Sequence, residues 1–315
     1  MFRVLQLNAA SQADGVGSAV TVGNFDGVHR GHQAMFARLN AVAAERGLVP
    51  TVMTFEPHPR EVFTPAQAPA RLTSLREKLE LFRGAGIERV TLVHFSRRFA
   101  KLSSDEFIQR LLITSLNARW VLVGDDFRFG AQRSGDFLSL QRAGVTHGFE
   151  VESLPSVLID GERASSTAVR AALAQGELDR AARILGRPYS IAGRVVHGDK
   201  LGETLGYPTA NIQLKHNRPP LSGIFAVELC GLDGGVLPGV ASLGVRPTVK
   251  QNGAATLEVH VFNFHDRIYG AHVRVDFLHK LRDEEKFSDL PALIAQIARD
   301  VSDAQAFFAG RLNTR

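Results

Sequence analysis

The first half of the chain alternates short apolar runs with stretches whose apolar residues recur every three to four positions. Runs of strand length are "AVTVGNF" at 19–25, "VPTVMTF" at 49–55, "RVTLVHF" at 89–95 and "RWVLVGDDF" at 119–127, and a later run, "FEVESLP" at 149–155, also suits a strand. Helical spacing is found between the apolar runs, at about 31–46, 73–85 and 104–116. Strands that alternate with amphipathic helices are typical of a parallel sheet covered on both faces. The pattern therefore predicts an α/β domain for this half.

After about residue 190 the pattern changes to short β-rich runs separated by Gly, Pro and Asn. Most of these runs leave no room for a helix between them, which favours an antiparallel barrel or sandwich. A final helix is predicted from about Ser288, with Pro291 in its first turn. The break falls at "ARILGRPYS", and we predict two domains, residues 1–185 and residues 186–315. The β-rich runs are found at 190–198, 223–231, 237–245, 255–264 and 271–280.

Composition narrows the class of protein without changing this picture. A chain of 315 residues with 44% hydrophobic and 22% charged residues suits an ordinary two-domain globular protein. The net charge of +5 is scattered, without a run of five or six Lys or Arg, so we predict no nucleic-acid partner. The lone Cys230 excludes an intramolecular disulfide and a cysteine-based zinc site.

The sequence also bears on location and assembly. No apolar run approaches the roughly 18 residues of a membrane helix. The first fifteen residues lack the apolar core of a signal peptide. We therefore expect a cytoplasmic protein that binds no membrane and is a monomer or a weak homo-oligomer.

One stretch, "VGNFDGVHRGH" at residues 22–32, follows a predicted strand and opens a predicted helix. A helix N-terminus at the carboxyl end of a parallel strand offers unpaired N–H groups and partial positive charge to a phosphate. His29 and His32 would add donors for charge that develops on a phosphoryl oxygen. A tight turn with incidental histidines is the alternative, but the histidine pair favours phosphate chemistry.

This stretch resembles the His-x-Gly-His signature of the nucleotidyltransferase superfamily. Further stretches resemble, in order, the motifs of the prokaryotic bifunctional riboflavin kinase/FAD synthetases (FMN adenylyltransferases). They are "TFEPHPRE" at 54–61, "VGDDFRFG" at 123–130, "ASSTAVR" at 164–170, "GDKLGETLGYPTAN" at 198–211, "GVASLGVRPTV" at 239–249 and "TLEVHVFNF" at 256–264. The resemblance covers essentially the whole chain. It implies a Rossmann-like nucleotidyltransferase domain followed by a mainly antiparallel β-barrel kinase domain with a C-terminal helix.

The resemblance also implies two ATP-dependent reactions: riboflavin is phosphorylated to FMN, and FMN is adenylylated to FAD with release of pyrophosphate. The phosphate of FMN is already an anionic nucleophile, so the second reaction needs orientation and charge stabilisation rather than a strong base. Residues implied to be catalytic there are His29, His32 and Arg170. ATP contacts are implied for Gly23, Asn24, Phe25, Asp26, Gly27, Gly31, Asp126, Arg163, Ser165, Ser166 and Thr167. A wall around the flavin is implied for Phe55, Pro57, His58 and Pro59.

The kinase reaction starts from an alcohol, a poor nucleophile that needs a base. Glu258 matches the family's proposed base, and strand alternation groups Glu258 with His260 and Phe262, which we expect to point into the barrel. Thr209 and Asn211 carry hard oxygens suited to Mg²⁺ held together with ATP phosphates. The resemblance implies ATP contacts for Gly198, Lys200, Gly202, Gly206 and Pro208, and a flavin contact for Arg246.

The match to the family is not complete, because Glu203 occupies a position where many members have Arg, and Ser242 one where Asn is common. We assign Glu203 no role. The residues leave two alternatives open. In the first, only one half is active, or the first half adenylylates another acceptor. In the second, the chain is a non-enzymatic flavin- or nucleic-acid-binding protein. The motif "TFEPHP" argues against the first alternative. The presence of His29, His32, Thr209, Asn211 and Glu258 together argues against the second.

Overall fold

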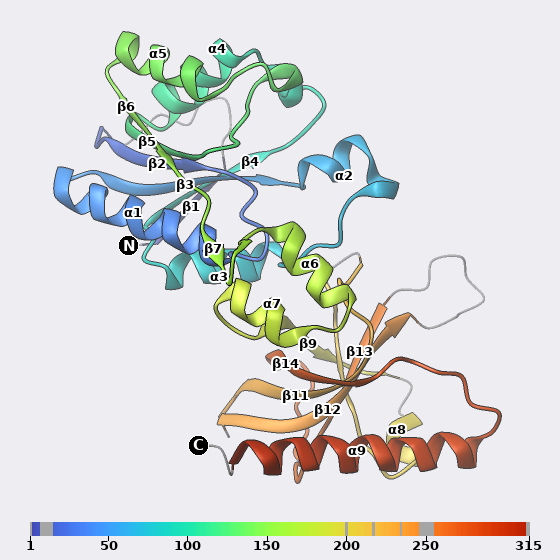
Figure 1. Cartoon of the computed structure of the whole chain (residues 1–315). Helices are drawn as coiled ribbons and strands as arrows, with labels where there is room; N and C mark the ends of the chain where they lie inside the picture. Colours follow the sequence, from blue (N-terminus) through green and yellow to red (C-terminus); the bar gives the residue numbers. More distant parts are fainter. Residues whose placement is uncertain are drawn as a thin grey trace. The chain divides into compact units, whose positions relative to one another are not determined.

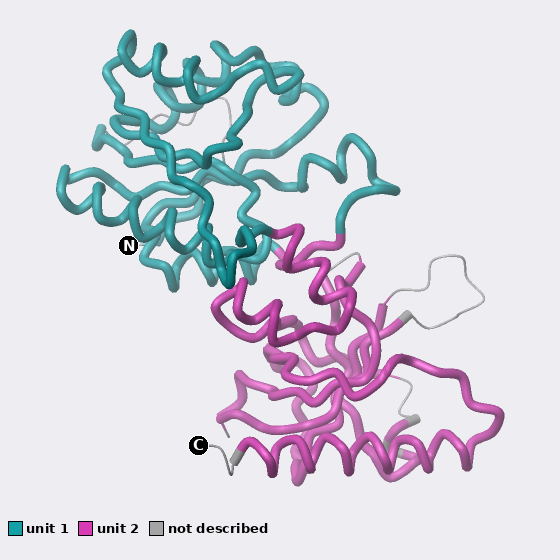
Figure 2. Tube along the Cα trace, viewed as in Figure 1, with its two compact units in different colours: residues 1–69, 75–165 teal, residues 70–74, 166–315 magenta. Residues whose placement is uncertain are grey.

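The computed structural model describes residues 2–6, 15–198, 201–215, 218–233, 235–245 and 255–312. The chain forms two compact units, residues 1–69 with 75–165, and residues 70–74 with 166–315 (Figure 2). The second unit therefore includes two helices that precede residue 186 in the chain. The boundary expected from the sequence, after residue 185, stays a prediction.

The first unit is built on a six-stranded sheet in the order β1-β4-β3-β2-β5-β6, and every pair is parallel. From β2, the chain adds β3 and β4 on one side and then β5 and β6 on the other. This reversal places a topological switch point between β2 and β5, where parallel α/β sheets bind ligands beyond the carboxyl ends of their strands. The strands are β1 (Arg3–Gln6), β2 (Ser18–Val22), β3 (Val49–Glu56), β4 (Arg89–His94), β5 (Ala118–Gly124) and β6 (Glu150–Leu154).

Helices cover both faces of this sheet, as the sequence pattern predicts (Figure 1). Phe36, Phe82 and Trp120 belong to a buried core beneath α1 and α3. A second core, on the other face, includes Leu112 of η3 and Leu140 of α5. The helices and short strands of this unit are α1 (Arg30–Arg46), α2 (Pro59–Phe63), η1 (Pro65–Gln67), α3 (Leu75–Gly84), η2 (Phe99–Lys101), α4 (Ser104–Phe107), the π-helix η3 (Ile108–Ser115), η4 (Ala131–Arg133), α5 (Phe137–His147), β7 (Leu158–Ile159) and β8 (Glu162–Arg163).

The second unit contains a closed antiparallel barrel in the order β10-β13-β12-β11-β14-β9, so the β-rich half is a barrel and not a sandwich. Its strands are β9 (Tyr189–Val196), β10 (Ala210–Ile212), β11 (Gly223–Leu232), β12 (Gly235–Val245), β13 (Ala255–Val261) and β14 (His272–Arg282). Its helices are α6 (Ser166–Ala174), α7 (Leu178–Leu185), α8 (Leu201–Thr204) and α9 (Leu290–Leu312).

The two faces of β13 are the reverse of what we expected. Leu257, Val259 and Val261 are buried, whereas Glu258 and His260 are only partly buried. Because apolar side chains fill the interior of a small barrel, the odd-numbered residues of this strand point inward. The expectation that Glu258 points into the barrel is therefore wrong, and its carboxylate lies on the outer face.

The C-terminal helix α9 packs on the outer face of the barrel. Val240 of β12, Ile224 of β11 and Ala304 of α9 are buried in one apolar cluster, and His279 of β14 stacks on Phe307 of α9. Asp289 caps this helix by accepting a hydrogen bond from the backbone N–H of Ala292 at 2.8 Å. The predicted helix is confirmed, and its apolar stripe is explained by packing on the barrel.

Candidate functional site

The loop between β2 and α1 holds an unusual backbone at the switch point of the sheet. Phe25, Gly27 and Val28 have φ angles of 49°, 81° and 45°, in the left-handed region. Only glycine adopts that region at low cost, and strain of this kind is concentrated at functional sites. A Cβ at Gly23 would lie 3.0 Å from the Phe25 ring, so glycine there leaves room for a phenylalanine that is 2% exposed.

The two histidines of this loop meet face to face. The rings of His29 and His32 stack with centroids 3.6 Å apart. His29 is the N-cap of α1 but makes no side-chain capping bond, and the first-turn N–H groups of α1 begin beside it. A Cβ at Gly31 would lie 3.1 Å from the His29 ring and 3.4 Å from the carbonyl oxygen of Ala164. Glycine at position 31 thus lets the loop, the histidine pair and the segment before Ser165 approach closely.

His32 is held in its neutral form. Burial lowers the pKa of His32 well below its ordinary value of 6.5, and the charges of His29 and Lys78 lower it further. Phe25 connects α1 to α3, because its ring packs edge-on against His32 of α1 and against Phe82 of α3. A neutral imidazole acts as a hydrogen-bond donor toward an anion without adding a full charge.

The sequence reasoning missed Lys78, which is 5% exposed. The signal was available, because Lys78 comes four residues before Phe82 in a predicted helix and so lies on its apolar face.

A second set of polar groups follows the carboxyl end of β5. Arg163 Nη2 lies 3.0 Å from Asp126 Oδ2 and 3.2 Å from Asp125 Oδ1. The Ser156 hydroxyl donates to Asp125 at 2.7 Å, and this bond, supported by Arg163, lowers the pKa of Asp125. The structure therefore brings the predicted residues Asp126 and Arg163 together. Asp125 and Ser156 were not predicted.

Ser166, Thr167 and Arg170 lie in the first turns of α6, in the second compact unit. The Nε–H of Arg170 donates to the carbonyl oxygen of Ala70 at 2.7 Å, which fixes the direction of the arginine within that unit. Phosphate contacts by these three residues and by Ser165 stay predictions.

The predicted flavin wall belongs to a larger aromatic group beyond the carboxyl ends of β3 and β4. Phe55 packs against Phe95 and Phe99 with ring centroids 5.8 Å away in both cases. Phe63, which is 53% exposed, packs on Phe95 at 5.7 Å. Phe63, Phe95 and Phe99 were not predicted, although two of them follow strand ends in the sequence.

His58, between Pro57 and Pro59, has a structural function in the same region. Its Nδ1 accepts a hydrogen bond from the backbone N–H of Arg60 at 3.2 Å, and the backbone N–H of His58 donates to Glu61 Oε2 at 3.2 Å. These bonds cap α2, which begins at Pro59. A flavin contact by His58 therefore stays a prediction.

In the barrel, the residues predicted for the kinase reaction lie side by side. Asn211 of β10 pairs with Glu258 of β13, and Glu258 pairs in turn with Ser242 of β12. Directly opposed residues of antiparallel strands point to the same face. The side chains of Asn211, Glu258 and Ser242 therefore form one row on the outer face of the barrel.

Two glycines, Gly198 and Gly202, pack against this row and the neighbouring Thr209. A Cβ at Gly198 would overlap the side-chain amide of Asn211, and one at Gly202 would lie 3.2 Å from Thr209 Oγ1. His260 Nδ1 donates to the carbonyl oxygen of Pro208 at 2.9 Å, because a carbonyl can only accept. The structure thus brings Gly198, Gly202, Pro208, Thr209, Asn211 and Glu258 together.

Three further observations concern this region. His260 was predicted to share a face with Glu258, but its contact with Pro208 was missed. His197, next to Gly198, stacks on Tyr269 with ring centroids 3.9 Å apart, an aromatic pair that was also not predicted. Gly206 has a φ of 85°, which requires glycine. Lys200 and Arg246 lie outside the described residues.

Comparison with known proteins decides the family. Residues 11–168 match the FAD synthetase family model and residues 185–308 match the riboflavin kinase family model. A bifunctional riboflavin kinase/FMN adenylyltransferase of Escherichia coli K12 is 49% identical, over 95% of each chain. The enzyme of the same name from Pseudomonas fluorescens is 50% identical, over 93% of this chain and 94% of its own. The chain belongs to the bifunctional riboflavin kinase/FMN adenylyltransferase family.

One solved structure shares the fold over nearly the whole chain. A crystal structure from Streptococcus pneumoniae, described as a macrolide-efflux protein, superimposes with a TM-score of 0.81 at 30% identity. The match covers 94% of this chain and 97% of the other. Within the described parts of this family member, we find no helix that is long and apolar enough to cross a membrane.

Mg²⁺ binding by Thr209 and Asn211 stays a prediction. Over the described ranges there is no group of three or more His, Cys, Asp and Glu side chains placed to hold a metal. Thr209 and Asn211 offer a hydroxyl and an amide oxygen next to Gly202 and Gly198. Magnesium commonly binds through few protein oxygens together with substrate phosphates and water, so these residues fit MgATP.

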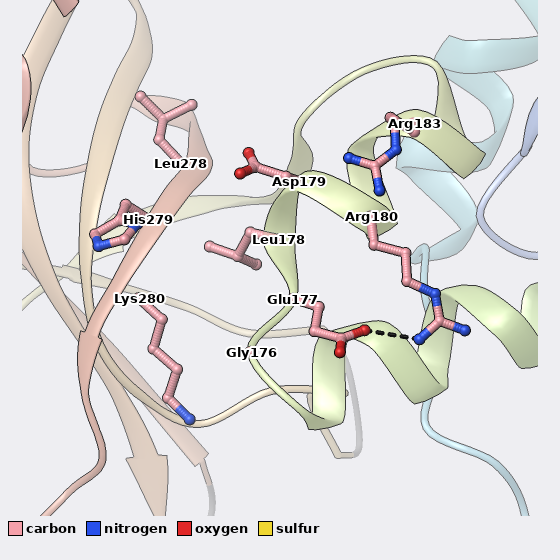
Figure 3. Close-up of a pocket in the computed structure, with 9 residues that line it drawn as sticks. All are labelled: Gly176, Glu177, Leu178, Asp179, Arg180, Arg183, Leu278, His279 and Lys280. Carbon is pink, nitrogen blue, oxygen red and sulfur yellow. Dashed lines mark hydrogen bonds and ion pairs between the residues drawn. The ribbon is translucent and has the colours of Figure 1, made fainter. Parts of the chain in front are cut away.

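A surface cavity of about 440 Å³ lies apart from these sites, between α7 and β14. Figure 3 shows that the guanidinium of Arg180 turns back to Glu177, where the two form an ion pair at 2.7 Å. Lys280, on the β14 side, is bonded to Asp283. Two of the cationic side chains are thus paired, and we assign this cavity no part in either reaction.

Proposed function

We propose that the two activities of this riboflavin kinase/FMN adenylyltransferase are carried by the loop 22–32 of the first unit and by the Asn211–Glu258 row of the second. The observation that supports this division most strongly is the pairing of Asn211 with Glu258. The proposed base and a proposed Mg²⁺ ligand lie next to each other there, on one face of the barrel. The histidine pair at the switch point, far away in sequence, suits the other reaction.

In adenylyl transfer, a phosphate oxygen of FMN attacks the α-phosphorus of ATP. The new bond joins that oxygen to the α-phosphorus, the bond between the α-phosphorus and the bridging oxygen breaks, and pyrophosphate leaves. His29, the neutral His32 and the N-terminus of α1 donate hydrogen bonds to the phosphate oxygens where charge develops. Asp126 and Arg163 contribute beyond the carboxyl end of β5, and Ser165 supplies a further hydroxyl donor.

The aromatic group around Phe55 receives the flavin ring of FMN. Phe63 presents an exposed ring, and Phe95 and Phe99 hold Phe55 at the carboxyl end of β3. Aromatic faces of this kind bury a planar ring and order it for reaction. This position leaves the phosphate of FMN free to reach the histidine pair, which follows the neighbouring strand β2.

In the kinase reaction, Glu258 removes the proton of the riboflavin 5′-hydroxyl as its oxygen attacks the γ-phosphorus of ATP. The bond between the γ-phosphorus and the β–γ bridging oxygen breaks, and ADP leaves. Thr209 and Asn211 would hold Mg²⁺, which neutralises charge on the phosphates when bound. Gly198 and Gly202 let the loop backbone approach, and His260 fixes the Pro208–Thr209 corner.

Variants that remove one activity at a time test this division. We expect Glu258→Gln to lower FMN formation at least about a hundredfold and to leave conversion of FMN to FAD within about twofold. His32→Ala should do the reverse, with both rates measured by product analysis with riboflavin or FMN and MgATP. Glu228→Gln, elsewhere on the barrel, and His147→Ala, at the end of α5, are matched controls. Parallel loss of both activities in either variant would contradict the proposal.

Other sequence predictions remain to be measured: a cytoplasmic location, no nucleic-acid partner, and a monomer or weak homo-oligomer. Sedimentation of the purified chain over a range of concentrations tests the last of these, and a stable oligomer at low concentration would contradict it.

A further inference from the structure

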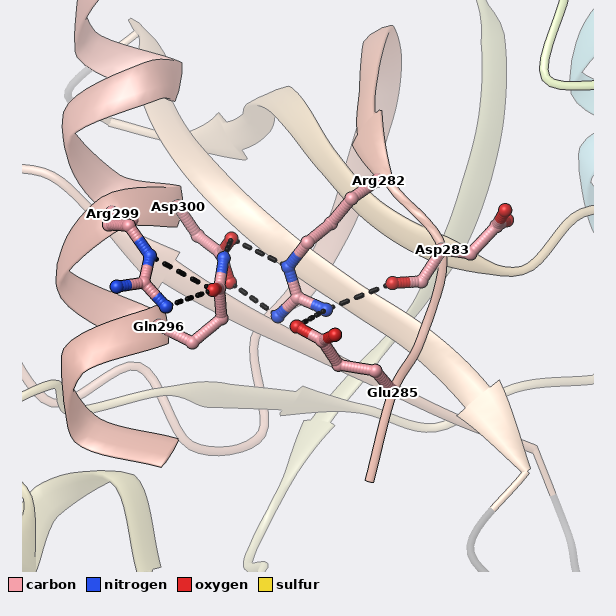
Figure 4. Close-up of polar contacts among 6 residues, drawn as sticks. All are labelled: Arg282, Asp283, Glu285, Gln296, Arg299 and Asp300. Atoms are coloured by element: carbon pink, nitrogen blue, oxygen red, sulfur yellow. Dashed lines mark hydrogen bonds and ion pairs between the residues drawn. The ribbon is translucent and has the colours of Figure 1, made fainter. Parts of the chain in front are cut away.

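Arg282, the last residue of β14, is anchored to α9 (Figure 4). Its Nε and Nη2 atoms donate to the two oxygens of Asp300, both at 2.7 Å. The side chain of Asp300 is only 6% exposed, and Gln296 donates to it at 2.9 Å. A bidentate, largely buried pair of this kind fixes direction as well as distance.

The same guanidinium also holds the start of the segment that joins β14 to α9. Its Nη1 donates to the carbonyl oxygen of Asp283 at 2.9 Å and lies 3.5 Å from Glu285 Oε1. The Arg282 guanidinium also lies over the ring of Phe287 at 5.8 Å. The position of Glu284, between Asp283 and Glu285, is therefore set by Arg282.

Glu284 lies on the face of the barrel that carries Glu258. A Cβ at Gly244 would coincide with the Glu284 carboxylate, so this carboxylate rests directly on β12. Gly244 is two residues beyond Ser242, about 7 Å along the strand and on the same face. Ser242 pairs with Glu258, and Gly244 pairs with Thr256. Two hydroxyl side chains and two carboxylates therefore occupy adjacent positions of one surface.

The Glu284 carboxylate is short of partners. It makes no hydrogen bond or ion pair with the residues that the structure describes, and burial raises its pKa although Arg282 acts in the opposite direction. A partly desolvated acceptor gains free energy when a hydroxyl donor reaches it. Riboflavin brings such donors, because its ribityl chain carries further hydroxyl groups beyond the one that reacts.

We propose that Glu284 accepts hydrogen bonds from ribityl hydroxyl groups of riboflavin and so determines the substrate specificity of the kinase, with Arg282 and Asp300 as positioning residues. A ribityl chain whose terminal hydroxyl lies at Glu258 extends past Ser242 toward the Glu284 carboxylate. The inference rests on the proposed role of Glu258 and deepens it.

The test uses the full chain and compares two flavins. In Glu284→Gln and Glu284→Ala, the KM for riboflavin in the kinase reaction should rise about tenfold or more, as expected for loss of a charged hydrogen bond. The KM for ATP should stay within about twofold. Lumiflavin, which has a methyl group in place of the ribityl chain, serves as a competitive inhibitor, and its Ki should not change. Asp283→Asn, the same charge change at a side chain that is 84% exposed, should behave as wild type.

A double-mutant cycle tests the positioning residues. Asp300→Asn should also raise the KM for riboflavin, but it should add little to Glu284→Ala, because both act through the same contact. A merely structural role for Asp300 would multiply KM by the same factor in both backgrounds, and this result would overturn the positioning role.

The results distinguish a failure of the proposed role of Glu284 from a failure of the proposed kinase site. If Glu258→Gln is inactive but the Glu284 variants keep the wild-type KM for riboflavin, only the role of Glu284 fails. Equal weakening of riboflavin and lumiflavin would also overturn it, since the effect would then not depend on the ribityl hydroxyls. If the alanine variant does not fold, the isosteric Glu284→Gln decides. If Glu258→Gln keeps full kinase activity, the proposed kinase site itself is wrong.

Discussion

A neutral histidine is an efficient partner for a reaction between two polyanions. The stacked rings of His29 and His32 could not both be charged at 3.6 Å without strong repulsion. Burial and the charges of His29 and Lys78 keep His32 neutral, so its imidazole donates a hydrogen bond without adding a full charge. Donors that need no reorganisation during the reaction stabilise developing charge most effectively.

The same burial makes the stability of the first unit depend on pH. Because the pKa of His32 is lower in the folded than in the unfolded chain, unfolding takes up a proton below about pH 6.5. The free energy of unfolding should therefore fall between about pH 7.5 and about pH 5.5, and His32→Gln should reduce this fall. Urea unfolding followed by the fluorescence of Trp120, the only tryptophan of the chain and 1% exposed, measures it.

Two details sharpen this measurement. The pKa values of Asp125 and Glu152 are also lowered, but these carboxyl groups change the free energy of unfolding only near and below their ordinary pKa values of 3.8 and 4.5, outside the chosen pH range. His147→Gln, at the end of α5, serves as the control and should keep the wild-type pH dependence. If the His32→Gln variant and the wild type lose stability in parallel, His32 is not the group responsible.

At the scale of elements, both candidate sites are formed where a glycine-containing loop meets the edge of a strand. In the first unit the loop joins β2 to α1 at the switch point, and in the second it packs on β10 and β13. The absence of a Cβ matters at Gly31 and Gly198, where a backbone and a functional side chain are in contact. Glycine here provides space rather than flexibility.

Gly198→Ala tests this requirement in the kinase unit. The added methyl group would displace the Asn211 amide, so we expect kcat/KM for FMN formation to fall about tenfold or more. Conversion of FMN to FAD should not change. Gly310→Ala, in α9 with no atom within 4 Å of the added Cβ, is the control. Kinase activity within twofold of wild type in Gly198→Ala would show that the loop is not packed as described.

The elements were predictable to different degrees. The strands β2 to β6 and the helices α1 and α3 have strong periodicity and were predicted within a few residues. The edge strand β1 and the three-residue β10 were missed, because so few residues carry no readable alternation. The inward face of β13 was assigned wrongly, since alternation alone gives two equivalent faces and only barrel closure selects one.

For the whole molecule, we assign the two reactions to separate compact units of one chain, and FMN is the product of one reaction and the substrate of the other. Each unit has its own core and its own candidate site. A change in one unit should therefore leave the other active.

A mixing experiment tests this independence. Neither the His32→Ala chain nor the Glu258→Gln chain should form FAD from riboflavin and MgATP alone. An equimolar mixture should form FAD after a lag, because FMN made by the first chain is adenylylated by the second. If the mixture forms no FAD while each chain keeps its remaining activity, FMN does not pass between molecules.

The amino-acid sequence by itself determined the two-part architecture, and it predicted phosphate binding at residues 22–32 and the residue types of both candidate sites, because periodicity and local motifs depend on neighbours along the chain. It could not determine that Glu258 faces outward, that Lys78 affects His32, or that Glu284 rests on Gly244. Those contacts join residues far apart in the sequence. They exist only once parallel strands and a closed barrel bring the residues together, and they then set burial, and with it charge.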